Sequence, residues 1–180
     1  MQAIVSTLED PYREMALDLW GGLKAVTGLK QLTGAASPRF SFQLAERYDR
    51  AAVAAALRAV AAETSSFTVA TGPAAVLRGP RHVVYLPVLA NDGLDRLHRA
   101  LWTRLGGLAE GLVDAHTPGL WAPHITLAAG HIDESRMPGV LRFLEGRDTR
   151  WTLPVTNIGH VADTSAAEAT VTVALRERLS

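Results

Sequence analysis

The sequence contains no cysteine. This absence excludes disulfide bonds, thiol catalysis and metal sites built from thiolates, and it fits a reducing compartment. No stretch approaches the roughly 18 uninterrupted apolar residues that a membrane span needs. The first residues, from Met1 to Val5, also lack the basic start of a secretion signal. We therefore expect a protein of the cytoplasm with no membrane partner.

The sequence also lacks an excess of either charge, because 18 Lys and Arg residues balance 18 Asp and Glu residues. Binding along a long nucleic acid depends on an excess of basic residues, whereas a short or terminal phosphate can be held in a neutral protein's pocket. No His-x-x-x-His spacing predicts a metal site, and no glycine-rich loop predicts a nucleotide-binding cradle. The composition leaves room for a small partner with a short or terminal phosphate, and we expect neither a metal nor a cofactor.

Helical and strand patterns alternate along the chain, which indicates the α+β class. With 180 residues, 48% of them hydrophobic, the chain can bury one good core, so we expect a single domain over residues 1–180. The order of elements is approximately repeated in the two halves, which suggests an internal duplication. The predicted helices span residues 11–28 (with Pro11 first), 49–63, 91–108 and 133–145, and the predicted strands span 2–8, 39–44, 67–77, 82–88, 124–127, 150–158 and 169–175.

Two of these strands carry side chains suited to chemistry. The segment His124–Leu127 reads His-Ile-Thr-Leu, so His124 and Thr126 point to one face of the strand. About half a chain earlier, Arg39–Phe42 reads Arg-Phe-Ser-Phe and has the same division of faces, with Gln43 extending the polar one. If the two polar faces line one groove, they suit an anion. Arginine and hydroxyl groups hold phosphate oxygens, and an imidazole with a pKa near ~6.5 passes protons at neutral pH.

These segments resemble the signature of the 2H phosphoesterases, which include proteins called 2′-5′ RNA ligases and RNA 2′,3′-cyclic phosphodiesterases. The signature is a pair of tetrapeptides, each His, hydrophobic, Thr or Ser, hydrophobic, separated by roughly half the chain. Residues 123–128 match the second tetrapeptide, residues 38–43 match the surroundings of the first, and the similarity extends over about residues 38–130. The resemblance implies two pseudo-symmetric lobes, each an antiparallel sheet backed by helices, around a central cleft, and metal-free chemistry.

The resemblance also implies roles for the residues of the two segments. His124 would transfer a proton, and Ser41 and Thr126 would bind the phosphate. Arg39 stands where the first histidine belongs. Because arginine stays charged, Arg39 can bind phosphate but cannot act as a general base.

Three further residues are expected to line the cleft: Gln43, Tyr85 and Trp121. For Trp121 two interpretations stay open, namely packing at the cleft rim and stacking on a nucleobase. A histidine from elsewhere in the chain could replace the first motif histidine, although none of the candidates stands at a position of the family's motifs. These candidates are His82, His116, His131 and His160.

The sequence leaves the function open between three interpretations. The first interpretation is a phosphoesterase that acts on a 2′,3′-cyclic phosphate or a 2′-5′ phosphodiester of a nucleotide or RNA end. Its activity would be weakened, because loss of one proton-transfer group typically costs about 10²- to 10⁴-fold in rate. The second is a non-catalytic module of the same fold that binds a nucleotide or phosphate. The third is a scaffold without a ligand.

Overall fold

A computed structural model of the chain describes residues 1–29, 32, 35, 37–79, 82–130, 132–163 and 171–177. Within these ranges the helices are α1 (Tyr12–Thr27), α2 (Arg50–Glu63), α3 (Asp92–Leu105) and α4 (Met137–Glu145), with the 3₁₀ turns η1 (Gly106–Leu108), η2 (Asp114–His116) and η3 (Glu134–Arg136). The strands are β1 (Gln2–Thr7), β2 (Arg39–Ala45), β3 (Arg47–Tyr48), β4 (Phe67–Thr71), β5 (Ala75–Leu77), β6 (His82–Leu89), β7 (Ala109–Glu110), β8 (His124–Gly130), β9 (Thr152–Val155), β10 (Asn157–Val161) and β11 (Val171–Ala174).

Among the described residues, nine strands form one sheet in the order β11-β10-β1-β2-β8-β6-β4-β9, with β5 paired beside β6. Neighbouring strands of this sheet run antiparallel. β2 and β8, which contain the two motif segments, are neighbours near its middle, where Phe40 pairs with Ile125. The fold thus joins two segments that are far apart in the sequence.

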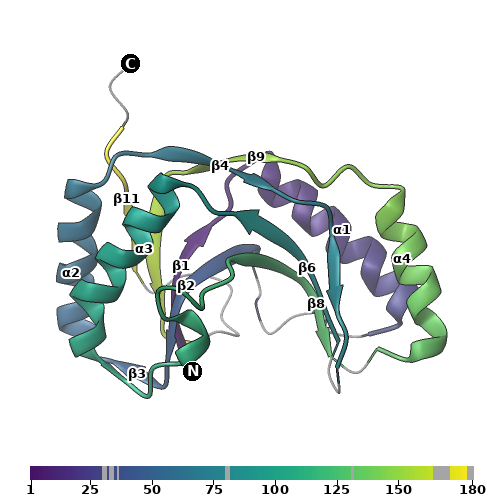
Figure 1. Cartoon of the computed structure of the whole chain (residues 1–180), viewed down its shortest axis with the longest axis horizontal. Helices are drawn as coiled ribbons and strands as arrows, with labels where there is room; N and C mark the ends of the chain where they lie inside the picture. The colour runs from purple at the N-terminus through teal and green to yellow at the C-terminus, as the bar shows by residue number, and fades with distance from the viewer. Residues whose placement is uncertain are drawn as a thin grey trace.

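The sheet curls between two pairs of helices, which gives the molecule two lobes (Figure 1). α2 packs against α3, β10 and β11 in one lobe, and α1 packs against α4 and β8 in the other. Each pair joins a helix from the first half of the chain to one from the second half. The α+β class and the two sheet-and-helix lobes agree with the sequence-based prediction. In the described part of the chain, no helix has both the length and the apolar character needed to cross a membrane.

Capping residues set the helix ends largely where the sequence predicts them. The Asp49 carboxylate accepts hydrogen bonds from the backbone N–H groups of Ala51 and Ala52 at 3.0 Å, and Asn91 caps α3 in the same way through Leu94. Gly28 ends α1 with a φ of 68°, a conformation that favours glycine. α1 begins at Tyr12, one residue later than predicted, with Pro11 in the preceding position and no side chain capping it.

Two of the predicted strands are divided in the structure. The segment 67–77 forms β4 and β5, which both pair with β6, because Gly72 and Pro73 interrupt it. The segment 150–158 falls partly in β9 and partly in β10, on opposite sides of Thr156. β9 pairs with β4, and β10 pairs with β1, so the chain passes from one edge of the sheet to its other side at this point.

Candidate functional site

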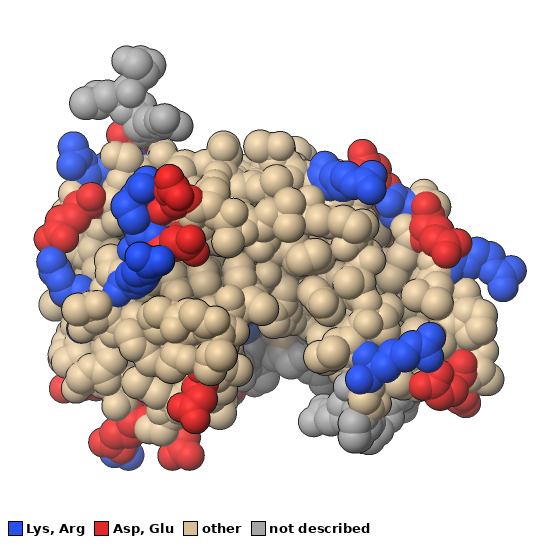
Figure 2. Space-filling view, viewed as in Figure 1, with Lys and Arg blue, Asp and Glu red and all other residues tan. Residues whose placement is uncertain are grey.

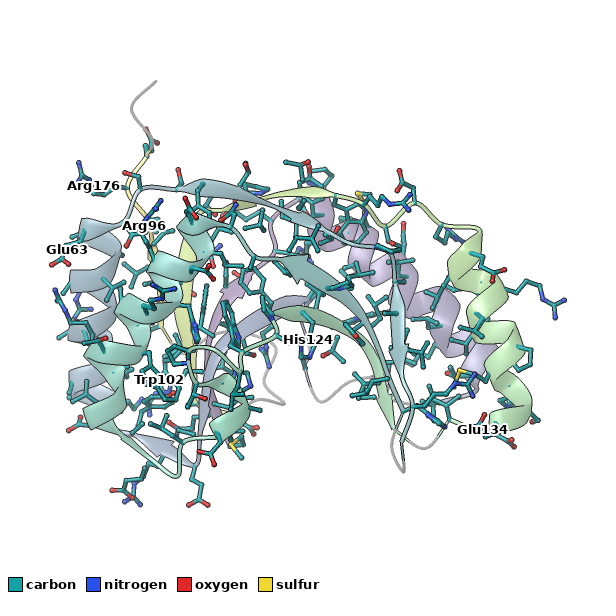
Figure 3. All side chains as sticks on the ribbon, viewed as in Figure 1. Glu63, Arg96, Trp102, His124, Glu134 and Arg176 are labelled. Carbon is teal, nitrogen blue, oxygen red and sulfur yellow. The ribbon has the colours of Figure 1, made fainter. Side chains whose placement is uncertain are left out.

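The polar side chains of β2 and β8 meet in one pocket of about 280 Å³. Arg39 and Ser41 line it from β2, and His124 and Thr126 line it from β8. Figure 3 shows His124 between the two lobes, and Figure 2 shows the surface hollowed between them at its lower edge. The other lining residues are Met1, Trp20, Ala35, Ser37, Leu44, His116 and Ala129.

The two motif strands are equivalent position by position, because each contains one additional residue at the same place. The pairing of β1 with β2 skips Phe42, and the pairing of β6 with β8 skips Leu127. Each is the fourth residue of its segment. Such a bulge reverses the alternation of faces beyond it. The first, third and sixth residues of both strands therefore reach the pocket, which makes Arg39 the structural counterpart of His124.

Two tryptophans hold these strands by equivalent bonds. The indole Nε1 of Trp121 donates to the carbonyl of Ser41 at 2.9 Å, and that of Trp20 donates to the carbonyl of Thr126 at 3.2 Å. Each bond fixes the backbone of the residue that carries a pocket hydroxyl. No local signal in the sequence marks Trp20 as a site residue, because only the packing of α1 on β8 brings it to the site.

A backbone bond orients the imidazole of His124. Its Nδ1 donates to the carbonyl of Ala122 at 2.8 Å, since a carbonyl only accepts. The proton is thereby held on Nδ1, and the lone pair of the neutral ring lies on Nε2. The ring of Tyr85 packs edge-on against that of His124, with 5.4 Å between the ring centroids. His124 is thus held in an orientation that suits proton transfer through Nε2.

Arg39 supplies a buried positive charge to the pocket. The residue is 8% exposed. Burial lowers the pKa of its guanidinium, and the carboxylate of Asp163 acts in the opposite direction. Arginine nevertheless stays charged at any ordinary pH. A desolvated cation beside two hydroxyl groups is a suitable place for an anion.

The sequence-predicted cleft residues fall in three different places. Gln43 does not reach the pocket and is 1% exposed, and its Oε1 accepts a hydrogen bond from the hydroxyl of Tyr48 at 2.9 Å. The reason is the bulge at Phe42, which turns Leu44 to the pocket in its place. Tyr85 flanks His124 and is not among the described lining residues. Trp121 packs against Phe42 and His98, which favours the packing interpretation.

Of the histidines proposed as replacements, His116 lines the pocket. His82 lies elsewhere, with its Nε2 3.1 Å from a carboxylate oxygen of Glu134. His160 is fully buried, and its Nε2 bonds to the Oε1 of Gln2 at 3.0 Å. His131 lies outside the described residues.

Larger hollows lie outside this region. One, of about 580 Å³, lies between α2, α3 and the start of β4, and another, of about 670 Å³, lies beside α4. Figure 3 places Glu63 and Arg96, which line the first, on the lobe of α2 and α3, away from His124. The described residues lining these hollows include no histidine. Within the described ranges, no group of three or more His, Asp or Glu side chains is arranged to hold a metal ion.

Comparisons with known proteins agree with this geometry. A sequence profile of the 2′-5′ RNA ligase superfamily matches residues 36–166. The chain is similar to a solved structure described as a phosphoesterase, with 17% identity, 98% of both chains covered and a TM-score of 0.62. It is also similar to Usb1 of Kluyveromyces marxianus, alone and with uridine monophosphate, with 12% identity, 97% of both chains covered and TM-scores of 0.51 and 0.52. No curated protein matches the chain in sequence.

At these identities the structural likeness establishes the fold, whereas the profile establishes the family. The matched segment extends over most of the chain and contains both motif strands. The chain therefore belongs to the 2′-5′ RNA ligase superfamily, one of the groups of 2H phosphoesterases.

Proposed function

We propose that this protein is a phosphoesterase that acts on a 2′,3′-cyclic phosphate or a 2′-5′ phosphodiester of a nucleotide or RNA end. His124 transfers a proton, and Arg39, Ser41 and Thr126 bind the phosphate. No metal ion takes part in this reaction. The observation that carries the proposal is the orientation of His124, whose Nδ1 bond to Ala122 leaves Nε2 for a bound substrate in the pocket of Arg39.

The size and charge of the pocket support a small anionic substrate. A volume of about 280 Å³ is at the low end for ligand pockets and suits a phosphate with its ribose. Arg39 supplies the charge, and the hydroxyl groups of Ser41 and Thr126 supply neutral donors. The Usb1 structure with uridine monophosphate shows that a protein of this fold binds a nucleotide phosphate. By analogy, the substrate of this chain is a nucleotide or an RNA end.

The activity is weaker than that of a site with two motif histidines. Arg39 occupies the position equivalent to that of His124, and it cannot exchange a proton at neutral pH. It can still stabilise negative charge on the phosphate in the transition state. The expected deficit is the contribution of one proton-transfer group, about 10²- to 10⁴-fold.

The position of Arg39 also favours a second function, a non-catalytic module that binds a nucleotide or phosphate. A permanent cation at the position equivalent to His124 strengthens anion binding, and it removes half of a symmetric acid–base pair. The two functions differ in turnover and agree in binding.

The test is hydrolysis of 2′,3′-cyclic UMP by the purified protein and by two variants. The wild type is expected to turn over slowly, and His124→Ala is expected to lose at least about 10²-fold in rate. Arg39→His is expected to gain activity, because it places a second imidazole at the equivalent position. Binding of uridine monophosphate is measured in parallel by calorimetry.

A histidine away from the pocket provides the control. His82→Ala removes an imidazole that pairs with Glu134 and is expected to keep the wild-type rate. Binding without turnover in the wild type, together with turnover in Arg39→His, would establish the binding module instead. Equal rates in the wild type and His124→Ala would contradict the catalytic role of His124.

A further inference from the structure

One histidine lies behind the pocket and is not among the described residues that line it. His98 lies on α3 and is 3% exposed. The other buried residues of this helix are leucines, at positions 94, 97, 101 and 105. A leucine at position 98 would fill the same core without a polar ring that needs hydrogen bonds, so packing alone does not favour a histidine here.

The backbone of the neighbouring segments orients the ring of His98. Its Nε2 donates to the carbonyl of His116 at 3.0 Å, since a carbonyl only accepts. Burial lowers the pKa of His98, and the backbone carbonyls of His116 and Phe42 act in the opposite direction. The ring is therefore neutral at neutral pH, and its one proton is engaged in the bond to η2.

The face of the oriented ring packs on Trp121. The two ring centroids are 3.9 Å apart, with 24° between the ring planes. The ring of Phe42 also packs on this indole, with 5.5 Å between centroids and 30° between planes. The indole Nε1 donates to the carbonyl of Ser41 at 2.9 Å. A chain of contacts thus runs from α3 through His98 and Trp121 to a residue whose hydroxyl lines the pocket.

The hydroxyl on the other motif strand is held without such a contact. Trp20 donates to the carbonyl of Thr126, but within the described part of the chain no aromatic or imidazole ring stacks on Trp20. The two motif strands are otherwise equivalent at these positions. His98 therefore acts on one of the two hydroxyls, and Thr126 is a reference for Ser41 within the same pocket.

We propose that His98 is a positioning residue, which through Trp121 fixes the hydroxyl of Ser41 for binding of the phosphate. This inference rests on the proposed function, in which Ser41 and Thr126 bind the phosphate. His98 itself neither touches the phosphate nor exchanges a proton with it. Its effect is to order the backbone at Ser41 before the phosphate binds, so that less ordering is needed on binding. α3 thereby contributes to the site, although none of its described residues lines the pocket.

The test measures binding of uridine monophosphate by calorimetry to the wild type and to variants of His98. His98→Ala removes the ring and is expected to weaken Kd about 3- to 10-fold, the contribution of one neutral hydrogen-bonding group. His98→Gln is the second variant, because its amide N–H can reach the carbonyl of His116 and its flat amide can lie on the indole. It is expected to fold as the wild type does and to lose less affinity than His98→Ala.

Two double variants identify the hydroxyl on which His98 acts. In His98→Ala/Ser41→Ala the second change removes the group that His98 positions, so this variant is expected to bind as Ser41→Ala does. In His98→Ala/Thr126→Ala the two changes act on different strands, so their factors in Kd are expected to multiply. A merely structural role of His98 would give multiplication in both pairs.

A second buried residue of α3 controls for a general loosening of the helix. Leu94 is fully buried, so Leu94→Ala is expected to lower the urea midpoint of unfolding and to keep the wild-type Kd. Equal weakening of Kd in Leu94→Ala and His98→Ala, a wild-type Kd in His98→Ala, or multiplication in both pairs would overturn the inference and leave the proposed function standing. Absence of binding by the wild type would overturn the nucleotide binding on which the proposed function depends, and the inference with it.

Discussion

Trp20 and Trp121 each donate an indole hydrogen bond to the carbonyl of a residue whose hydroxyl lines the pocket. Neither indole is charged, so both bonds persist at any pH. A net hydrogen bond contributes about 0.5–1.5 kcal/mol, and here its further effect is to fix the positions of Ser41 and Thr126. The phosphate-binding hydroxyls of the proposed site are therefore held by groups that take no part in its chemistry.

The titratable residues around the core predict how stability depends on pH. Burial lowers the pKa values of His98, His116 and His160. On acidification the unfolded chain therefore binds protons before the folded protein does, and the stabilisation is lost as the pH falls through the ordinary histidine range near ~6.5. We expect the free energy of unfolding, measured with urea, to decrease from pH 8 to pH 5.5.

A variant identifies part of this pH dependence. His160→Gln keeps an amide that can bond Gln2 and does not titrate, so its free energy of unfolding should change less over the same range. A wild-type stability that is constant or increases on acidification would contradict the assignment.

Strand alternation predicts that Arg39 shares a face with Ser41 and that His124 shares one with Thr126, and all four residues line one pocket. Alternation does not select His116, which lines the same pocket, from the other histidines. That choice depends on the bonds that attach η2 to β2 and to His98, and neither bond has a local signal in the sequence.

At the scale of elements, the two bulged strands determine which side chains reach the pocket. Alternation predicted that Gln43 would follow Ser41 on the polar face, and the bulge at Phe42 reverses the alternation beyond that point. The predicted strand was right, and the predicted face of its second part was wrong. A bulge depends on pairing with the neighbouring strand, so the sequence of β2 alone does not reveal it.

The bulge in β8 predicts opposite effects for two adjacent alanines. Ala129 lines the pocket, so Ala129→Phe should fill it and abolish binding of uridine monophosphate, as measured by calorimetry, while the protein stays folded. Ala128 is fully buried, so Ala128→Phe should overpack the core and cost about 1–3 kcal/mol in urea unfolding. The reverse pattern would mean that β8 alternates without a bulge.

At the scale of the whole molecule, each lobe joins a helix from one half of the chain to a helix from the other. The central pairing of β2 with β8 then puts the site between the lobes. Acidic and basic side chains are interspersed on both lobes in the view of Figure 2, and the surface between them carries few charges. On this face the residues that the structure describes form no basic track for a long nucleic acid, in keeping with the balanced composition.

This distribution of charge predicts a weak dependence of binding on salt. Each phosphate contact with a single strand contributes about −0.7 to the slope of log affinity against log salt concentration. An RNA oligonucleotide held by one terminal phosphate should give a slope no steeper than about −1 between 50 and 200 mM KCl by the same rule. A slope near about −4 would instead indicate six phosphate contacts, and with them a binding surface that extends beyond the pocket.

The bond between Trp20 and Thr126 also makes the pocket optically visible. An indole that lines the cavity and is bonded to its wall changes its emission when water there is displaced. The chain has four tryptophans, and Trp102 lies on α3 in the other lobe, so a Trp20→Phe variant isolates the contribution of the cavity. Occupancy can therefore be followed by intrinsic fluorescence, without a label on the protein or the nucleotide.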